Sequence, residues 1–176
     1  MQYCPHCRET LTLRLIDATE RLACPAPNCS FVHWNNPVPV VGGIIRIGDR
    51  YVLAQNAAWP EGIYSMITGF LEANEVPDDA IRRETQEELG VTAERITFLG
   101  HYSLPKFNQL IIAYLVEAHG EISLNEELVA VKYLSHDELA RYDFGRLKLT
   151  AEIVGRVLAV NAAHTPATEA LSSSSG

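Results

Sequence analysis

The stretch from Gly69 to Val91 reads GFLEANEVPDDAIRRETQEELGV and is the most informative part of the chain. Its middle, from Pro77 to Leu89, has the pattern of a helix. Pro77 and two following aspartates open this helix, and Gly90 closes it. The sequence therefore predicts a helix directly after a short loop that begins at Gly69.

Three glutamates lie on one side of this predicted helix. At about 100° per residue, Glu84, Glu87 and Glu88 project together, beside a row that faces the core (Ile81, Thr85, Leu89). Like charges at this spacing cost about 0.2–0.5 kcal/mol per pair in an isolated helix. We therefore expect a compensating cation, and Mg²⁺ or Mn²⁺ fits because hard cations take oxygen ligands. A solvated acidic face is the alternative interpretation.

Two neighbours strengthen the interpretation as a metal site. Arg83 can form a bidentate pair with a carboxylate and fix its rotamer. Gly69 permits close backbone approach, so its carbonyl is a candidate for a further oxygen ligand.

Together these residues resemble the Nudix box, whose pattern is Gly, five residues, Glu, seven residues, Arg-Glu, an apolar residue, any residue, Glu-Glu, any residue, Gly and an apolar residue. The fixed positions are all met, by Gly69, Glu75, Arg83, Glu84, Glu87, Glu88, Gly90 and Val91. Thr85 stands where the family usually has an aliphatic side chain, and its hydroxyl needs a hydrogen-bond partner. We expect Thr85 to affect stability and not chemistry.

The resemblance implies an α/β fold, the Nudix α/β/α sandwich around a mixed sheet, and a metal-dependent hydrolase that cuts a diphosphate linkage. It implies that Glu84, Glu87 and Glu88 bind the divalent ions, that Gly69 contributes its carbonyl and that Arg83 orients Glu84. Glu75 has a structural or outer-sphere role. Bound cations polarise the diphosphate and lower the pKa of the attacking water.

All four cysteines lie near the start of the chain. Cys4 and Cys7 form one close pair, and Cys24 and Cys29 form a second after a spacer of hairpin length. Two such pairs supply four thiolates for a closed, structural Zn²⁺ site, with free or redox-active thiols as the alternative. His6 and His33 are superfluous once four sulfurs are counted.

Composition divides the chain into a zinc ribbon over residues 1–34, a Nudix domain over 35–164 and a disordered tail over 165–176. Within the Nudix domain, strand patterns alternate with turns, and two helices follow. We expect the strands at 38–47, 51–55, 63–70, 96–104, 110–118 and 129–134, a capped helix from Ser135 to Arg141, and a last helix at 147–163.

The net charge of −8 argues against a surface built to hold long nucleic acids. There is no signal segment and no run of about 18 apolar residues that could span a bilayer. A cytoplasmic protein is therefore expected.

A zinc ribbon directly before a Nudix domain resembles the NADH pyrophosphatase group, and this likeness implies a homodimer. In that group an aromatic residue after the box glycine and another after the ribbon contact the nucleotide, and these correspond here to Phe70 and Trp34. Stacking of a base is worth about 1–3 kcal/mol. Packing alone is the other interpretation of each ring. A late-loop glutamate of the family, which binds metal or activates water, corresponds to Glu127, with Glu126 as the competing choice.

Two departures keep the substrate open. The group's Ser-Gln-Pro-Trp-Pro-Phe-Pro segment is only partly retained in residues 103–109, and its Tyr-Pro-Arg is replaced by Trp34, Asn35 and Asn36. NADH or NAD is the leading substrate, and ADP-ribose, FAD or a nucleotide-capped RNA end presents the same diphosphate. The hypothesis from another class is a nucleotide sensor or RNA-binding module that does not cut its ligand.

Overall fold

The computed structural model describes residues 1–164, so the tail at 165–176, for which disorder was predicted, lies outside the described residues. The chain divides into two compact units, Met1–Pro37 and Val38–Gly176. The first unit contains a small antiparallel sheet of β1 (Thr12–Ile16), β2 (Thr19–Ala23) and β3 (Val32–His33). No helix in the described part of the chain is both long and apolar enough to cross a membrane.

The second unit is built on a mixed sheet in which β4 (Val38–Ile47) is central. Its strands run in the order β7-β8-β4-β5-β9, and β6 also pairs with β4. The pairing of β4 with β8 is parallel and the other pairings are antiparallel. The remaining strands are β5 (Arg50–Asn56), β6 (Ile67–Phe70), β7 (Thr92–Leu104), β8 (Gln109–His119) and β9 (Leu128–Leu134).

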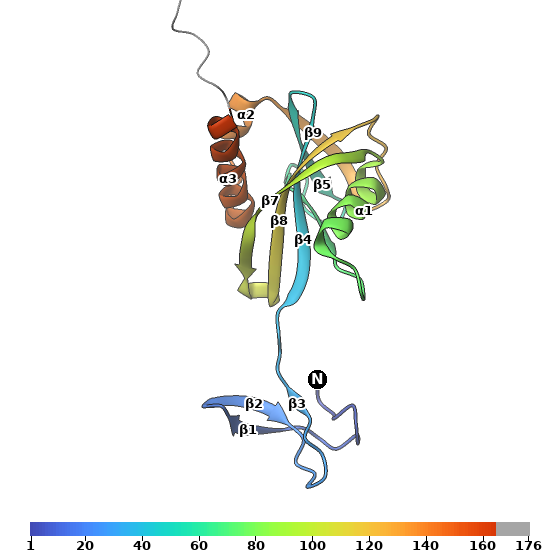
Figure 1. The fold of residues 1–176 in the computed structure, drawn as a ribbon, viewed down its shortest axis with the longest axis vertical. Helices are drawn as coiled ribbons and strands as arrows, with labels where there is room; N and C mark the ends of the chain where they lie inside the picture. The colour runs from blue at the N-terminus through green and yellow to red at the C-terminus, as the bar shows by residue number, and fades with distance from the viewer. Residues whose placement is uncertain (165–176) are drawn as a thin grey trace, which may run out of the picture. The chain divides into compact units, whose positions relative to one another are not determined.

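Helices cover both faces of this sheet (Figure 1). Helix α1 (Pro77–Leu89) packs on one face, and α2 (His136–Ala140) and α3 (Lys148–His164) lie on the other. A short 3₁₀ helix, η1 (Pro105–Phe107), joins β7 to β8. The α/β/α sandwich expected from the resemblance is confirmed.

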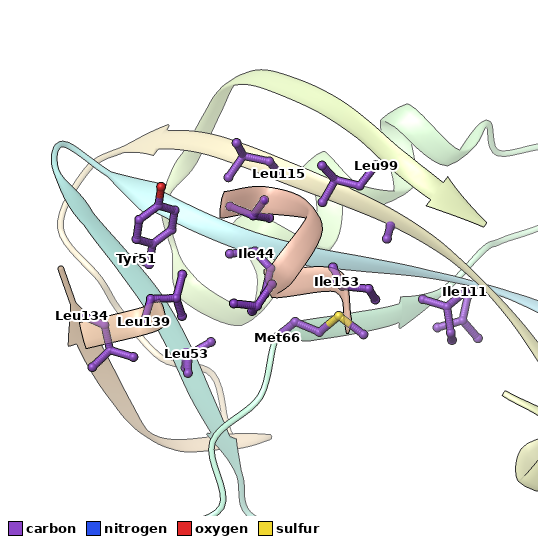
Figure 2. Close-up of a cluster of buried hydrophobic side chains, with 14 residues drawn as sticks. Ile44, Tyr51, Leu53, Met66, Leu99, Ile111, Leu115, Leu134, Leu139 and Ile153 are labelled. Carbon is purple, nitrogen blue, oxygen red and sulfur yellow. The ribbon is translucent and has the colours of Figure 1, made fainter. Parts of the chain in front are cut away.

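The alternation of side chains along β4 produces the two cores. Val40 and Ile44 point into the cluster under α3, whereas Val41 and Ile45 point into the cluster under α1. Figure 2 shows the first cluster, where Ile153 of α3 meets strand residues such as Ile44. The alternating hydrophobic side chains of β4 therefore contribute to a core on each face of the sheet.

Most expected elements are confirmed, and two strands differ from the prediction. The strand expected at 63–70 covers only Ile67–Phe70, because only these residues pair with β4 and Ser65 makes an isolated bridge to Ala54. The strand expected at 96–104 begins at Thr92. It is an edge strand, and its polar first residues carry no hydrophobic alternation.

Candidate active site

Helix α1 brings the acidic residues to the site, and its ends are determined by local sequence. Pro77 stands in its first turn, and Gly90 ends it with a φ of 69°, in the left-handed region that favours glycine. Thr85, the departure from the Nudix pattern, is fully buried, and its hydroxyl donates to the carbonyl of Ile81 at 2.7 Å. The hydroxyl thus has the partner that it needs, and Thr85 faces the core.

Arg83 is the centre of an ion-pair network. Its Nε and Nη2 atoms donate to the two carboxylate oxygens of Glu75 at 2.8 and 3.0 Å. Its Nη1 atom donates to Glu84 at 2.7 Å and to Glu87 at 3.0 Å, and Nη2 also reaches the carbonyl of Phe70 at 3.0 Å. The guanidinium lowers the pKa of Glu75 to about 2. Arg83 therefore joins the helix to the loop after β6.

Glu88 differs from its neighbours because it is buried and has no ion pair in the described residues. Burial raises its pKa to about 8, and the nearby charges of Glu84, Glu127 and Glu87 add to that shift. Burial likewise raises the pKa of Glu84, against the lowering effect of Arg83. A concentration of carboxylates with this unfavourable electrostatics is chemically suited to a divalent cation, which would offset the charge.

Glu127 and Glu87 complete the acidic group in different ways. Glu127 lies in the loop before β9, close enough for its charge to raise the pKa of both Glu84 and Glu88. The side chain of Glu87 is 55% exposed and turns toward Arg83. The structure thus brings Glu84, Glu88 and Glu127 to one region, with Glu87 at its solvent-exposed edge. No such electrostatic contact is recorded for Glu126 within the described residues.

Gly69 packs directly against Glu84. A Cβ atom at Gly69 would lie 1.8 Å from Cδ and 1.9 Å from Oε1 of Glu84, a separation that no side chain tolerates. The glycine therefore lets the carboxylate lie against the backbone of β6, where the Gly69 carbonyl is a candidate oxygen ligand.

Replacing Gly69 by alanine is expected to displace Glu84 and to lower turnover by about a hundredfold, since misplacing a catalytic group by about 1 Å costs that much. A Cβ atom at Gly155 of α3 would meet no other atom within 4 Å, so Gly155→Ala is the matched control. Alanine there should stabilise the helix by about 0.5–1 kcal/mol and leave turnover unchanged. Steady-state kinetics and thermal unfolding check both, and normal turnover in Gly69→Ala would contradict the steric role.

A large cavity is bordered by the same strand that contacts the carboxylates. Its volume is about 1020 Å³, at the upper end of the range for small-molecule sites. Gly69 and Phe70 of β6 belong to its lining, so this strand contacts both the acidic group and the cavity. Phe70 is 59% exposed. Its ring is therefore not part of the hydrophobic core.

Sequence reasoning missed most of the residues that line this cavity. Trp59 and Phe107 contribute further aromatic rings, and Lys106, Arg146 and Lys148 contribute cations. Lys106 and Phe107 belong to residues 103–109, which the sequence analysis used only to show that the chain departs from the NADH pyrophosphatase group. In the sequence these residues are only aromatic or cationic side chains in turns. Such a side chain does not by itself show that its turn borders a cavity in the folded protein.

Lys132 of β9 holds the aromatic wall of the cavity in place. Its ammonium lies 4.4 Å from the ring centre of Tyr64 and 5.0 Å from that of Tyr142. Tyr142 in turn contacts Phe144 edge to face at 4.9 Å. All three rings line the cavity, so this cation joins β9 to the loop before α3.

Trp34 belongs to the first unit, whereas Phe70 belongs to the second. The Trp34 ring is 47% exposed, and the guanidinium of Arg21 lies 4.9 Å from its centre. Within its own unit Trp34 lines a hollow of about 480 Å³ together with Leu13 and His33.

The four cysteines meet at one point in the first unit. Their sulfur atoms all lie within 4.8 Å of one another, with Cys4 to Cys29 at 3.6 Å and Cys7 to Cys24 at 3.3 Å. Four sulfurs bound tetrahedrally at about 2.3 Å from zinc lie about 3.8 Å apart. The donor set therefore fits Zn²⁺. His6 instead packs against the ring of Phe31, at 5.2 Å.

Two relatives match the chain over about two thirds of its length. The human mitochondrial NAD(P)H pyrophosphatase NUDT13 is 30% identical over 128 residues, covering 70% of this chain and 36% of the human protein. The NAD-capped RNA hydrolase NudC of Chromobacterium violaceum is 28% identical over 119 residues, covering 68% of this chain and 43% of that protein. The chain thus spans less than half the length of these relatives.

A solved structure supports the fold over both units. The crystal structure of a NUDIX hydrolase from Nitrosomonas europaea has a TM-score of 0.77 and 24% identity, and the likeness covers 96% of this chain and 97% of that one. The NUDIX domain model matches residues 36–153, which is most of the chain. With this match, the box geometry and the sandwich fold in agreement, the chain belongs to the NUDIX family.

Proposed function

We propose that the chain is a metal-dependent hydrolase that cleaves the diphosphate linkage of a dinucleotide such as NADH or NAD into two mononucleotides. The observation that carries the proposal is the buried carboxylate of Glu88, which lies near the charges of Glu84 and Glu127. Glu84 in turn packs against Gly69 of β6, a strand that also lines a nucleotide-sized cavity. The names of the two relatives support a substrate of this kind, because they print NAD(P)H and NAD-capped RNA, which both contain the dinucleotide diphosphate.

Each group has a distinct part in this proposal. Glu84, Glu88 and Glu87, with the Gly69 carbonyl, would hold Mg²⁺ or Mn²⁺, which when bound polarises the diphosphate and acidifies the attacking water. Arg83 keeps the Glu84 carboxylate in its rotamer through the 2.7 Å hydrogen bond. Glu127, whose charge acts on Glu88, is proposed to take the proton that the water loses. Water adds to one phosphorus, the bridging P–O bond breaks, and two monophosphates leave.

The base and ribose of one half of the substrate would occupy the cavity. Phe70 is at the boundary between cavity and carboxylates and offers its exposed ring for stacking. Trp34 stays the second proposed stacking residue. The homodimer expected from the sequence stays a prediction.

The direct test is a substrate panel on the full chain. NADH, NAD, ADP-ribose, FAD and an NAD-capped RNA are incubated with Mg²⁺ or with Mn²⁺, and the monophosphate products are separated by chromatography. We expect metal-dependent release of AMP from NADH or NAD. If none of the compounds is cleaved with either metal while nucleotides still bind, the sensor hypothesis replaces the enzymatic one.

Phe70→Ala and Trp34→Ala then test the two stacking residues. Loss of one stacked ring should raise KM for the preferred dinucleotide about five- to a hundredfold, with a smaller change in kcat. Val129→Ala is a control, because this residue is also an exposed apolar side chain and does not line the cavity. Unchanged KM in both aromatic variants would assign these rings to packing.

A further inference from the structure

Lys132 is a cation whose neighbours on the same face of β9 are apolar. It pairs in register with Leu53 of β5, which is fully buried in the core under α3 (Figure 2). Ala130 and Leu134, which share its face of β9 by alternation, are also apolar. Lys132 itself is half-buried. An apolar side chain at this position would serve folding at least as well, so the cation needs another explanation.

The ammonium of Lys132 lies beside two aromatic rings and not beside a carboxylate. It is 4.4 Å from the ring centre of Tyr64 and 5.0 Å from that of Tyr142. Within residues 1–164 no ion pair is recorded for Lys132, whereas Arg83 and Arg95 are paired with carboxylates. A cation is attracted to the negative face of an aromatic ring. The two rings therefore take the place that a carboxylate usually has, and the cation in turn fixes the orientation of the rings.

The loop between α2 and α3, residues 141–147, depends on this contact for a polar link to the sheet. In the described residues its backbone hydrogen bonds stay within the loop or run to the adjacent helices, as with the amide of Tyr142, which donates to the carbonyl of Leu139 at 3.2 Å. None of them reaches a strand. Tyr142 and Phe144 do pack against the core under α3. Packing thus holds the loop on the sheet, and Lys132 orients the Tyr142 ring relative to β9.

Lys132 lies behind the cavity and does not border it. Three rings line the cavity and form what is here called the aromatic wall, Tyr64, Tyr142 and Phe144, whereas Lys132 is not part of the lining. Tyr142 contacts Phe144 edge to face at 4.9 Å, so a shift of one ring moves the other. A ligand in the cavity would therefore touch the aromatic wall and feel Lys132 only through it.

Strand β9 also carries the opposite side of the site. It begins directly after Glu127, whose carbonyl accepts a hydrogen bond from the amide of Ala57 at 2.8 Å. Ala57 opens the segment at residues 57–66 that contains Tyr64. One strand therefore holds Glu127 at its start and Lys132 farther along, and the segment fastened to Glu127 supplies one of the rings that Lys132 contacts. This arrangement fixes the aromatic wall relative to the acidic residues.

We propose that Lys132 is a positioning residue for the nucleotide ring that occupies the cavity. It orients Tyr64 and Tyr142 so that the aromatic wall presents a face on which the ring stacks, and it does not touch the ligand itself. The inference deepens the proposed function and rests on it for the identity of the ligand, a dinucleotide. Because the acidic residues are left in place, a change at Lys132 should weaken binding of the dinucleotide much more than it slows bond breaking.

The test compares two substitutions of Lys132 in the full chain. Lys132→Met removes the charge and keeps a flexible side chain, whereas Lys132→Arg keeps a cation that can lie over a ring. NADH is titrated through its own fluorescence without added divalent metal. We expect the Kd to rise about two- to thirtyfold in Lys132→Met, the equivalent of about 0.5–2 kcal/mol for a cation–π contact, and to return close to the original value in Lys132→Arg. Arg156→Met is the matched control, because Arg156 is exposed on α3 and does not line the cavity.

A purely structural role for Lys132 predicts a different result. Lys132→Met would then lower the unfolding temperature and leave the Kd of the folded chain unchanged. A double-mutant cycle with Tyr142→Leu separates the two roles further. If the cation acts through this ring, Lys132→Met should change the Kd less in the Tyr142→Leu chain than in the unmodified one. A Kd for Lys132→Met equal to that of Arg156→Met, or fully additive effects in the cycle, would overturn the positioning role.

Kinetics keep this inference separate from the proposed hydrolysis. With Mg²⁺ or Mn²⁺ present, KM for NADH should rise in Lys132→Met while kcat stays within about twofold, the pattern of an interaction made equally in the ground and transition states. Weaker NADH binding by Lys132→Met in a chain that cleaves no dinucleotide would keep the positioning role and reject hydrolysis. Cleavage of NADH with the same Kd and KM in both chains would do the reverse.

Discussion

Replacing Glu88 by glutamine is expected to lower kcat by about a thousandfold or more, which corresponds to losing several kcal/mol of transition-state stabilisation by a bound cation. The amide keeps the shape of the side chain but cannot supply a charged oxygen ligand. Helix α1 should be unaffected, because Glu88 makes no ion pair in the described residues that the substitution could break. Steady-state kinetics over a range of Mg²⁺ and Mn²⁺ concentrations measure the effect.

The same substitution has an independent signature in stability. Without divalent metal, the folded-state pKa of Glu88 is raised from the usual 4.5 to about 8, chiefly by burial. A raised carboxyl pKa destabilises the fold above the unfolded pKa, and this cost grows until the pH reaches the folded pKa. Below about pH 4.5 the cost is absent. The free energy of unfolding of Glu88→Gln, relative to that of the unmodified chain, should therefore grow by about 2–3 kcal/mol as the pH rises from about 5.5 to 8.

Denaturant unfolding at several pH values measures this gain, and Glu121→Gln is the matched control, since Glu121 is exposed. The control should follow the unmodified chain in both kinetics and unfolding. Unchanged kcat in Glu88→Gln would remove Glu88 from the active site. Stability curves that stay parallel across this pH range would show that Glu88 is not a buried charge.

Loss of zinc is expected to unfold the first unit while the second unit keeps its structure. The interior of residues 1–37 consists mainly of two of the cysteines themselves, Cys4 and Cys24, together with Leu11. Chains below about 40 residues rarely fold without a metal or disulfide, and zinc contributes about 10–16 kcal/mol in comparable sites. The four cysteines form no disulfide that could replace it. Cys24→Ser should therefore abolish both zinc binding and this unit's fold.

Zinc content by mass spectrometry and backbone amide NMR of the full chain measure this effect. His6→Ala is the matched control, because His6 stands in the sequence between Cys4 and Cys7 and packs on Phe31 instead. It should keep one zinc per chain. Stoichiometric zinc in Cys24→Ser, or protected amides in the first unit after zinc removal, would contradict the structural role. Because Trp34 belongs to this unit, its proposed stacking should be lost with the metal.

The elements that the sequence predicted best are those whose ends are determined locally. Helix α1 begins and ends as expected because proline and the left-handed Gly90 act within one turn of chain. The capping box of Ser135 and Glu138 was likewise predicted and is confirmed by reciprocal hydrogen bonds of 2.8 and 3.3 Å. Strand ends were predicted less well, because a strand stops where its partner stops. The shortened β6 is an example.

The sequence by itself determined the family, the acidic face of α1 and the four-sulfur cluster, because each is written in spacings of a few residues along one helix or two short turns. Only the tertiary structure decided that Glu88 is buried and unpaired, that Gly69 touches Glu84, and that Glu127 lies near both carboxylates. The same holds for the cavity, whose lining includes residues of β4, the segment before β6, β6 itself, the segment after β7 and the loop before α3. Such contacts join residues far apart in sequence, and their energies depend on burial, which appears only when the sheet and its helices have packed.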